Sequence, residues 1–295
     1  MNRFTFYIVD VFAEKKYTGN QLAVFRNAGK LSDIEMQCLA KEMNYSETTF
    51  ILSEKKRDEG YDVRVFTLEE EIPFAGHPTL GTAYVIQSEI IGEPVRKVIL
   101  NLKIGQIPVT VNYKEEKVDI LWMKQKAPVF SKIFDREQIS EVLSISKGEI
   151  DDRFPVQEVS TGLPFIIVPL KNLNALKKAQ IKKEAYFRLI ENTDAKAILI
   201  FSPQTYKKEN DLNVRVFADY YGVPEDPATG SANGCLAGYL VKYRYFGNER
   251  IDVRVEQGYE IGRPSLLFLK AEEKEGRIDV FVGGKVIMTA KGKLV

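Results

Sequence analysis

Histidine and cysteine are scarce in this chain, which has one histidine and two cysteines among its 295 residues. The cysteines, Cys38 and Cys235, show neither metal-binding nor redox spacing, and a structural zinc site needs four nitrogen or sulfur ligands. We therefore expect no metal and no disulfide framework. Isolated cysteines are typical of a protein in a reducing cytoplasm, and we expect both to pack inside helices.

An excess of charge of either sign is also absent, since 42 basic residues face 41 acidic ones. Nucleic acids and anionic membrane surfaces attract a basic excess, so neither partner is expected. No apolar run is long enough to span a membrane. The short apolar run near the start contains Asp10 and lacks a small-residue cleavage site, which favours a strand over a signal peptide. Walker A and Rossmann glycine patterns are missing, so no cofactor is expected.

Apolar residues, in contrast, are plentiful: 44% of the chain is hydrophobic and 11% is aromatic. Such a composition supports packed interiors. A chain of 295 residues is long for one core, so two domains are expected. We place the crossing between them at residues 124–131.

Two stretches of the chain repeat each other. With a gap of two residues, residues 64–66 (RVF) match residues 215–217, and residues 77–83 (HPTLGTA) match residues 226–232 (DPATGSA). Each copy is predicted to form a strand, a turn and a buried helix. The chain is therefore an internal duplication.

The alignment makes His77 and Asp226 equivalent, each directly before a proline. Proline is favoured at the first helical position, where its missing N–H group costs no hydrogen bond. His77 and Asp226 are therefore predicted as the N-cap residues of two helices. If the halves pair about a pseudo-twofold axis, both helix N-termini would face one cleft, where free N–H groups and the helix dipoles favour a carboxylate.

Three segments resemble the signature motifs of the PhzF-like (phenazine biosynthesis) family: NYSETTF around Glu47, FAGHPTLGTA and EDPATGSANG. The resemblance extends from YIVDVFAEKKYTGNQLAVF near the start to FVGGKVIMTAKG near the end. It implies the diaminopimelate epimerase fold, an α+β architecture of two pseudo-symmetric domains, each with a β-sheet wrapped around a central helix. It also implies that residues 285–295 return to a first domain formed by residues 1–124, that residues 125–284 form the second, and that the protein is a homodimer.

Glu47, His77 and Asp226 are the candidate catalytic residues. Glu47 lies where a loop becomes a strand, and partial burial there would raise the pKa of its carboxyl toward the range of a general acid. The resemblance makes Glu47 the leading acid/base. A lone histidine is more often structural, and the helix dipole disfavours its charged form, so His77 is predicted to orient other groups. Asp226 would serve as a cap, yet it also stands where the other copy carries a group able to hold a proton.

The candidate substrate-binding residues are small or polar: Ser231, Thr229, Asn20, Gly76 and Gly230. The glycines would leave backbone N–H groups accessible to a carboxylate, or serve backbone conformation alone. The Ser231 hydroxyl would bind substrate, or pack as a small side chain. Asn20 follows a Thr-Gly turn that either approaches the ligand or is only a hairpin turn.

Three local patterns predict structure elsewhere. Residues 32–35 (SDIE) form a capping box that starts a helix reaching Asn44. Residues 135–143 predict a helix, and Gly283-Gly284 predicts a hairpin turn.

These features favour a cytoplasmic, metal-free and cofactor-independent isomerase that moves a proton within a small unsaturated or cyclic carboxylate. One alternative is a carboxylate-binding protein without catalysis, against which Glu47 speaks, since anion binding gains nothing from another carboxylate. The other is an epimerase in which Glu47 and Asp226 act as opposed bases.

Overall fold

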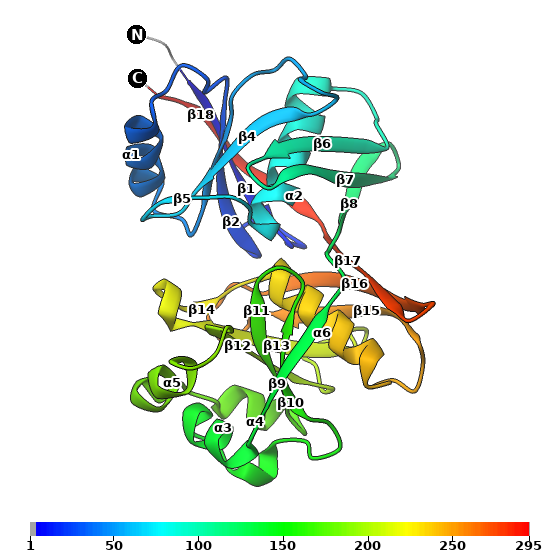
Figure 1. Ribbon diagram of the computed structural model, residues 1–295. Coiled ribbons are helices and arrows are strands. Elements are labelled where there is room, and N and C mark those ends of the chain that lie inside the picture. Colours follow the sequence, from blue (N-terminus) through cyan, green and yellow to red (C-terminus); the bar gives the residue numbers. More distant parts are fainter. Residues whose placement is uncertain (1–3, 295) are drawn as a thin grey trace. The chain divides into compact units, whose positions relative to one another are not determined.

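The structure, a computed structural model, describes residues 4–294 and forms two compact units (Figure 1). The first unit comprises the chain through Lys124 together with the segment from Gly283 onward, and the second comprises residues 125–282. No helix within the described residues has the length and apolarity to cross a membrane.

The first unit is mostly strand, with one buried helix. Its strands are β1 (Thr5–Val11), β2 (Asn20–Arg26), β3 (Thr48–Ile51), β4 (Tyr61–Phe66), β5 (Glu71–Ile72), β6 (Lys97–Leu102), β7 (Gly105–Lys114), β8 (Lys117–Lys124) and β18 (Val286–Lys293). Its helices are α1 (Asp33–Met43), α2 (Gly76–Val85) and the short η1 (Ile86–Ile91). Nine of the ten residues of α2 are buried, and its neighbours include β1, β2, β3 and β6.

The second unit is built in the same way around α6. Its strands are β9 (Val129–Phe134), β10 (Val156–Ser160), β11 (Pro164–Pro169), β12 (Ala197–Ser202), β13 (Leu212–Ala218), β14 (Val223–Asp226), β15 (Arg250–Gln257) and β16 (Ser265–Lys274), and β17 (Arg277–Gly284) ends in the first unit. Its helices are α3 (Arg136–Leu143), α4 (Leu173–Lys178), α5 (Lys183–Ile190), α6 (Gly230–Lys242) and the short η2 (Lys147–Glu149) and η3 (Asp219–Tyr221). Figure 1 shows α6 among the strands of this unit.

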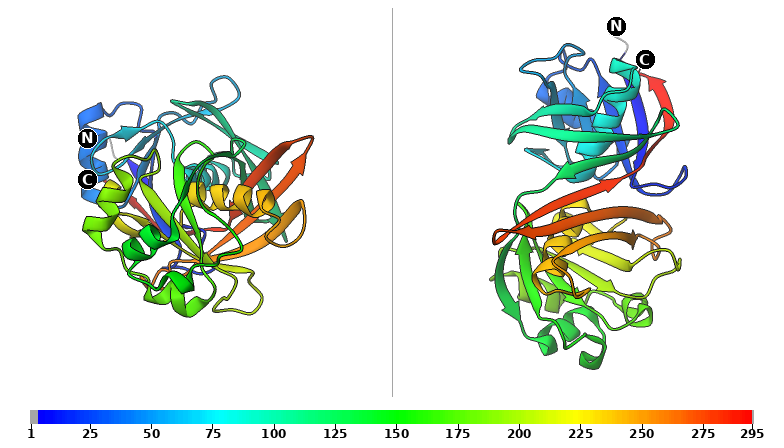
Figure 2. Two further views of the ribbon diagram at one scale, coloured as in Figure 1. Left: turned by 60° about the horizontal axis from the view of Figure 1, so that its bottom comes forward. Right: turned by 90° about the vertical axis from the view of Figure 1, so that its right-hand side faces the viewer.

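Strand pairing repeats between the units, as an internal duplication requires. In the first, β1–β2 is antiparallel, β2–β3 parallel, β3–β4 antiparallel and β4–β6 parallel. In the second, β10–β11, β11–β12, β12–β13 and β13–β15 follow the same sequence of senses. The closing strand β18 runs antiparallel to β1, just as β9 runs antiparallel to β10. In the right-hand view of Figure 2, β18 is the red strand next to the blue β1. The expected α+β fold is therefore confirmed, although part of the predicted crossing at 124–131 belongs to strand β9.

Strand register gives the alignment of the two copies at the helix starts. Ile72 pairs with Val65, and Asp226 pairs with Val216, the equivalent residue of the RVF segment. Helices α2 and α6 each begin four residues later, at positions 76 and 230. Val65 and Ile72 are seven residues apart, and Val216 and Asp226 are ten apart, so the second copy has three extra residues in this turn.

This register corrects the predicted equivalence of His77 and Asp226. His77 is the second residue of α2, and Ser231 is the second residue of α6, so these two are equivalent. Asp226 is equivalent to Ile72. The alignment with a two-residue gap misplaced the helices because both contain many small residues, as helices enclosed by strands do. When one helix is shifted by five residues relative to the other, small residues still align with small residues.

The N-cap predictions for His77 and Asp226 are wrong for the same reason. The N-cap residues are Ala75 and Thr229, neither of which makes a side-chain capping bond. Pro78 is the third helical residue, a position whose N–H group has no intrahelical partner in any case, so the helix can begin before it. Asp226 ends β14 instead.

The remaining local predictions divide between right and wrong. The Ser32 capping box and the helix over residues 136–143 are confirmed, as is the burial of Cys235. The expected packing of Cys38 is wrong: Cys38 is exposed, because Met36 and Ala40 are the residues of this helix that face the core.

The expected hairpin turn at Gly283-Gly284 is wrong, because both glycines are extended residues of β17. They are needed for packing. A Cβ atom at Gly283 would lie 2.6 Å from the Trp122 ring, and one at Gly284 would lie 2.3 Å from the Phe12 ring. The aromatic rings therefore occupy the space that side chains would take.

An arginine–glutamate pair anchors the strand that leads into each central helix. In the first unit Arg64 binds Glu71 through two hydrogen bonds and is partly exposed. In the second, Arg215 binds Glu225 in the same way, and both side chains are 9% exposed. Glu225 directly precedes Asp226, so this buried pair fixes the backbone that carries the Asp226 carboxylate.

Candidate active site

Glu47 and His77 meet in the first unit. Glu47 lies directly before β3, and His77 lies in the first turn of α2. The Glu47 carboxylate Oε2 atom is 3.4 Å from the His77 Nε2 atom. The Glu47 side chain is 19% exposed and the His77 side chain is 7% exposed. Because apo active-site contacts are often longer than the working hydrogen bond, this distance is suitable for an acid/base pair.

Burial keeps the His77 imidazole neutral. Desolvation lowers its pKa from 6.5 to about 3, and a hydrogen bond with the backbone of Gln21 opposes this less strongly. A hydrogen bond to the backbone raises the pKa of an imidazole when a ring N–H group donates to a carbonyl oxygen. Since Nε2 faces Glu47, the donor is Nδ1–H, and Nε2 is left with a lone pair that can accept a proton or a hydrogen bond.

His77 should make the stability of the protein depend on pH. Below pH 6.5 the unfolded chain binds a proton that the folded chain, with a pKa of about 3, does not bind. The free energy of unfolding should therefore fall by about 1.4 kcal/mol for each pH unit between about 6.5 and 3, and the effect should vanish above that window. His77→Gln removes the only imidazole. Between pH 7.5 and 5, wild type should lose about 2 kcal/mol more than the variant in urea denaturation. Equal losses would show that the folded imidazole takes up the proton.

Asn20 and Gly76 also lie in the first unit. Asn20 is 3% exposed at the start of β2, and Gly76 is the buried first residue of α2. The turn before Asn20 has a conformational reason for its glycine: Gly19 has φ +72°, and a Cβ atom there would lie 2.3 Å from the Val11 carbonyl oxygen. Gly19 therefore serves the hairpin turn, and a ligand role for Asn20 stays a prediction.

Asp226 and Thr229 meet in the second unit. The Thr229 hydroxyl donates a hydrogen bond to the Asp226 Oδ2 atom. A buried glutamine, Gln257, binds the same loop: its Nε2 donates to the Asp226 carbonyl oxygen at 2.8 Å and to the Thr229 hydroxyl at 3.1 Å. Ser265 donates to the Pro227 carbonyl oxygen at 2.8 Å. These bonds hold the loop between β14 and α6 in one conformation.

Sequence reasoning missed Gln257, which ends β15. The structure supplies the signal that the sequence lacks: Glu256 and Gln257 are consecutive polar residues at the end of a strand, yet both are fully buried. The predicted binders Ser231 and Gly230 begin α6, with Gly230 buried and Ser231 half-buried. The predicted residues thus form two groups, one in each unit.

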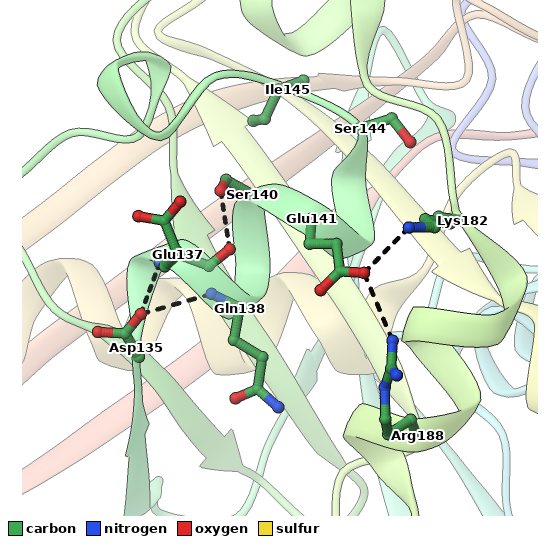
Figure 3. A pocket seen from close by; sticks show the side chains of 9 residues that line it. All are labelled: Asp135, Glu137, Gln138, Ser140, Glu141, Ser144, Ile145, Lys182 and Arg188. Atoms are coloured by element: carbon green, nitrogen blue, oxygen red, sulfur yellow. Dashed lines mark hydrogen bonds and ion pairs between the residues drawn. The ribbon is translucent and has the colours of Figure 1, made fainter.

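A separate hollow of about 790 Å³ lies on the second unit between α3 and α5 (Figure 3). On its wall the Glu141 carboxylate accepts hydrogen bonds from Lys182 at 3.0 Å and from Arg188 at 3.4 Å. No predicted site residue lines it. Glu141, Lys182 and Arg188 bind one another, Glu137 pairs with Lys147, and Asp135 caps α3, so we do not assign the chemistry to this hollow.

Two units, each with strands around a buried central helix, place this chain among proteins with the epimerase fold. A hydroxyproline epimerase from Agrobacterium vitis has this fold, with a TM-score of 0.62, 8% identity, and coverage of 100% of this chain and 91% of that one. A phenazine biosynthesis protein of the PhzF family from Bacillus anthracis is more similar, with a TM-score of 0.91, 24% identity and full coverage of both chains.

The chain belongs to the phenazine biosynthesis-like protein family, whose pattern matches residues 9–292. A relative from Pseudomonas fluorescens, trans-2,3-dihydro-3-hydroxyanthranilate isomerase, is 33% identical over 293 residues, with 98% of this chain and 99% of the relative covered. The family resemblance seen in the three motifs is confirmed, and the protein is an enzyme of the isomerase class.

Proposed function

We propose that this isomerase moves a proton between two carbon atoms of a small unsaturated or cyclic carboxylate, without metal or cofactor. The observation that carries the proposal is the contact between Glu47 and a neutral His77. A carboxyl group beside a proton-accepting nitrogen can both take up and release a proton. We further propose that Asp226, Ser231 and Gly230 of the second unit are substrate-binding groups, which the duplication and the family resemblance support.

The proposed reaction moves one proton within the substrate and needs no other reactant. The Glu47 carboxylate removes a proton from one carbon, and the electron pair of that C–H bond moves into the conjugated system. The protonated Glu47 then returns the proton to a different carbon. The His77 Nε2 atom accepts a hydrogen bond from the protonated carboxyl, which orients it between the two steps. Asp226 and Ser231 would polarise and bind the substrate, with the Gly76 and Gly230 N–H groups available to its carboxylate.

The repeat favours this reaction over two-base epimerisation. Thr48 and Ile198 occupy equivalent register positions, opposite Phe66 and Phe217, so the residue equivalent to Glu47 is Ala197. Asp226, in turn, is equivalent to Ile72. Neither carboxylate has an acid or base at the equivalent position of the other unit, which supports a single proton shuttle.

The substrate class follows from the relatives. The Pseudomonas fluorescens relative is named for a cyclic amino carboxylate, and we propose a substrate of the same kind here. A homodimer working in the cytoplasm is part of the proposal, supported by the family resemblance and by the two free cysteines.

Aromatic carboxylates should stabilise the protein against heat, whereas nucleotides should not. Anthranilate has a carboxylate for the helix N-termini and a ring of the proposed substrate's size. At a concentration about 100 times its Kd it should add about 2.7 kcal/mol of stability, a Tm increase of roughly 5 °C for a chain of this size. Differential scanning fluorimetry with anthranilate and AMP measures both. A shift with AMP and none with anthranilate would contradict the proposed substrate class.

A further inference from the structure

The loop that carries Asp226 is held by polar side chains that have apolar equivalents in the first unit. Register pairs Asn213 with Glu256 in one unit and Asp62 with Asn101 in the other, so Gln257 is equivalent to Leu102. Three positions differ in this way: Ile72, Ala75 and Leu102 stand where Asp226, Thr229 and Gln257 stand in the second unit. The fold therefore does not require polar residues at these positions.

Gln257 uses its full hydrogen-bonding capacity on this loop. Its two N–H groups donate to the Asp226 carbonyl oxygen and to the Thr229 hydroxyl. Its Oε1 atom accepts from the Thr229 backbone N–H at 3.2 Å and from the Asn233 side chain at 2.9 Å. The Asn233 amide also donates to the Thr229 carbonyl oxygen at 3.0 Å. Only one orientation of the Gln257 amide satisfies a carbonyl acceptor and a backbone donor together, so its oxygen and nitrogen are assigned unambiguously.

This arrangement determines the direction of the next hydrogen bond. Because the Thr229 oxygen accepts an N–H from Gln257, its own proton is directed to the Asp226 carboxylate. The chain of bonds runs from the Gln257 amide through the Thr229 hydroxyl to Asp226. Gln257 is fully buried, and buried chains of hydrogen bonds strengthen one another. One amide thus holds both the backbone and the carboxylate of Asp226.

We propose that Gln257 is a positioning residue for the isomerase, holding Thr229 as a donor so that the Asp226 carboxylate keeps one orientation toward the substrate. This inference rests on the proposed function of Asp226. It also changes the role expected for Thr229, whose hydroxyl serves Asp226 and is not free to bind substrate.

The test uses Gln257→Leu, which introduces the residue of the first unit, and Gln257→Glu, which keeps size but removes the N–H donors. Each should lower kcat 10- to 100-fold with little change in KM, since small displacements of a catalytic group cost rates of this order. The control is Gln157→Leu in β10. Gln157 is also a buried glutamine of this unit, donating to the Ser131 carbonyl oxygen and accepting from Tyr243, and its loss should leave kcat within about twofold.

A double-mutant cycle separates positioning from general destabilisation. If Gln257 acts through Asp226, adding Gln257→Leu to Asp226→Asn should lower kcat by less than twofold further. A full 10-fold additional loss would overturn the proposal, as would an unchanged kcat in both Gln257 variants. Turnover is measured with trans-2,3-dihydro-3-hydroxyanthranilate.

Hydrogen exchange provides a readout that does not depend on turnover. The Thr229 amide donates to Gln257, so peptides covering residues 226–233 should exchange at least 10-fold faster in Gln257→Leu and remain unchanged in Gln157→Leu. Absent turnover in wild type together with faster exchange would refute the proposed substrate while supporting Gln257 as the group that holds the loop. Unchanged exchange would overturn the positioning inference whatever the activity.

Discussion

Replacing Glu47 with glutamine is expected to lower turnover by on the order of 10²-fold or more while leaving substrate affinity intact. The amide keeps the size and hydrogen-bonding reach of the carboxyl but cannot take up and return a proton, and general acid–base catalysis contributes about this factor. Binding should survive or tighten, since the neutral amide removes an ionised carboxylate that would face an anionic substrate. Steady-state kinetics and calorimetric titration with anthranilate measure the two quantities separately.

Glu42→Gln is the matched control, because Glu42 is an exposed carboxylate of α1 in the same unit. It should change neither turnover nor binding. If Glu47→Gln turns over at the wild-type rate, Glu47 is not in the mechanism. If it loses binding and turnover together, Glu47 is a contact or structural residue, and the non-catalytic carboxylate-binding alternative gains support.

Asp226→Asn is expected to lower turnover by a similar factor, about 10²-fold, with little loss of stability. The asparagine oxygen can still accept the hydrogen bond from Thr229, and Gln257 binds the backbone carbonyl of residue 226, which the substitution keeps. What disappears is the negative charge that would polarise the substrate. Kinetics and urea unfolding of the same preparations provide the comparison. Wild-type turnover would exclude Asp226 from the chemistry, and a large drop in the unfolding midpoint would reassign it to stability.

The fold could be predicted from sequence because strands and buried helices produce strong local patterns. The repeated RVF segments revealed the duplication and predicted a strand and a buried helix in each copy, as found in β4 with α2 and in β13 with α6. The crossing at 124–131 hid β9, whose residues are largely exposed and which pairs with β10. Burial patterns cannot locate such an edge strand.

The sequence could name candidate site residues but not their spatial relationships. The family motifs pointed to Glu47, His77 and Asp226, and the structure brings Glu47 and His77 into contact. The equivalence of His77 with Asp226 failed because small residues dominate both enclosed helices, so several alignments fit equally well. Only strand register, which places Asp226 opposite Val216, distinguishes them.

Gln257 was beyond sequence reasoning for a different reason. It is 28 residues from Thr229 and 31 from Asp226 along the chain, and a polar residue at a strand end is usually solvent-exposed. The proposed role of Gln257 rests on its burial and on the leucine at the equivalent position of the first unit. This equivalence can be recognised only after the two units are aligned by strand register.

The claim that Glu47 carries a proton from one carbon to another is tested most directly by turnover in deuterated water, followed by proton NMR. With trans-2,3-dihydro-3-hydroxyanthranilate, wild type should form an isomerised product in which any deuterium lies at the carbon that receives the proton, and Glu47→Gln should form product on the order of 10²-fold more slowly. Deuterium at an inverted stereocentre without movement of a double bond, or equal rates for the two proteins, would contradict the proposed mechanism.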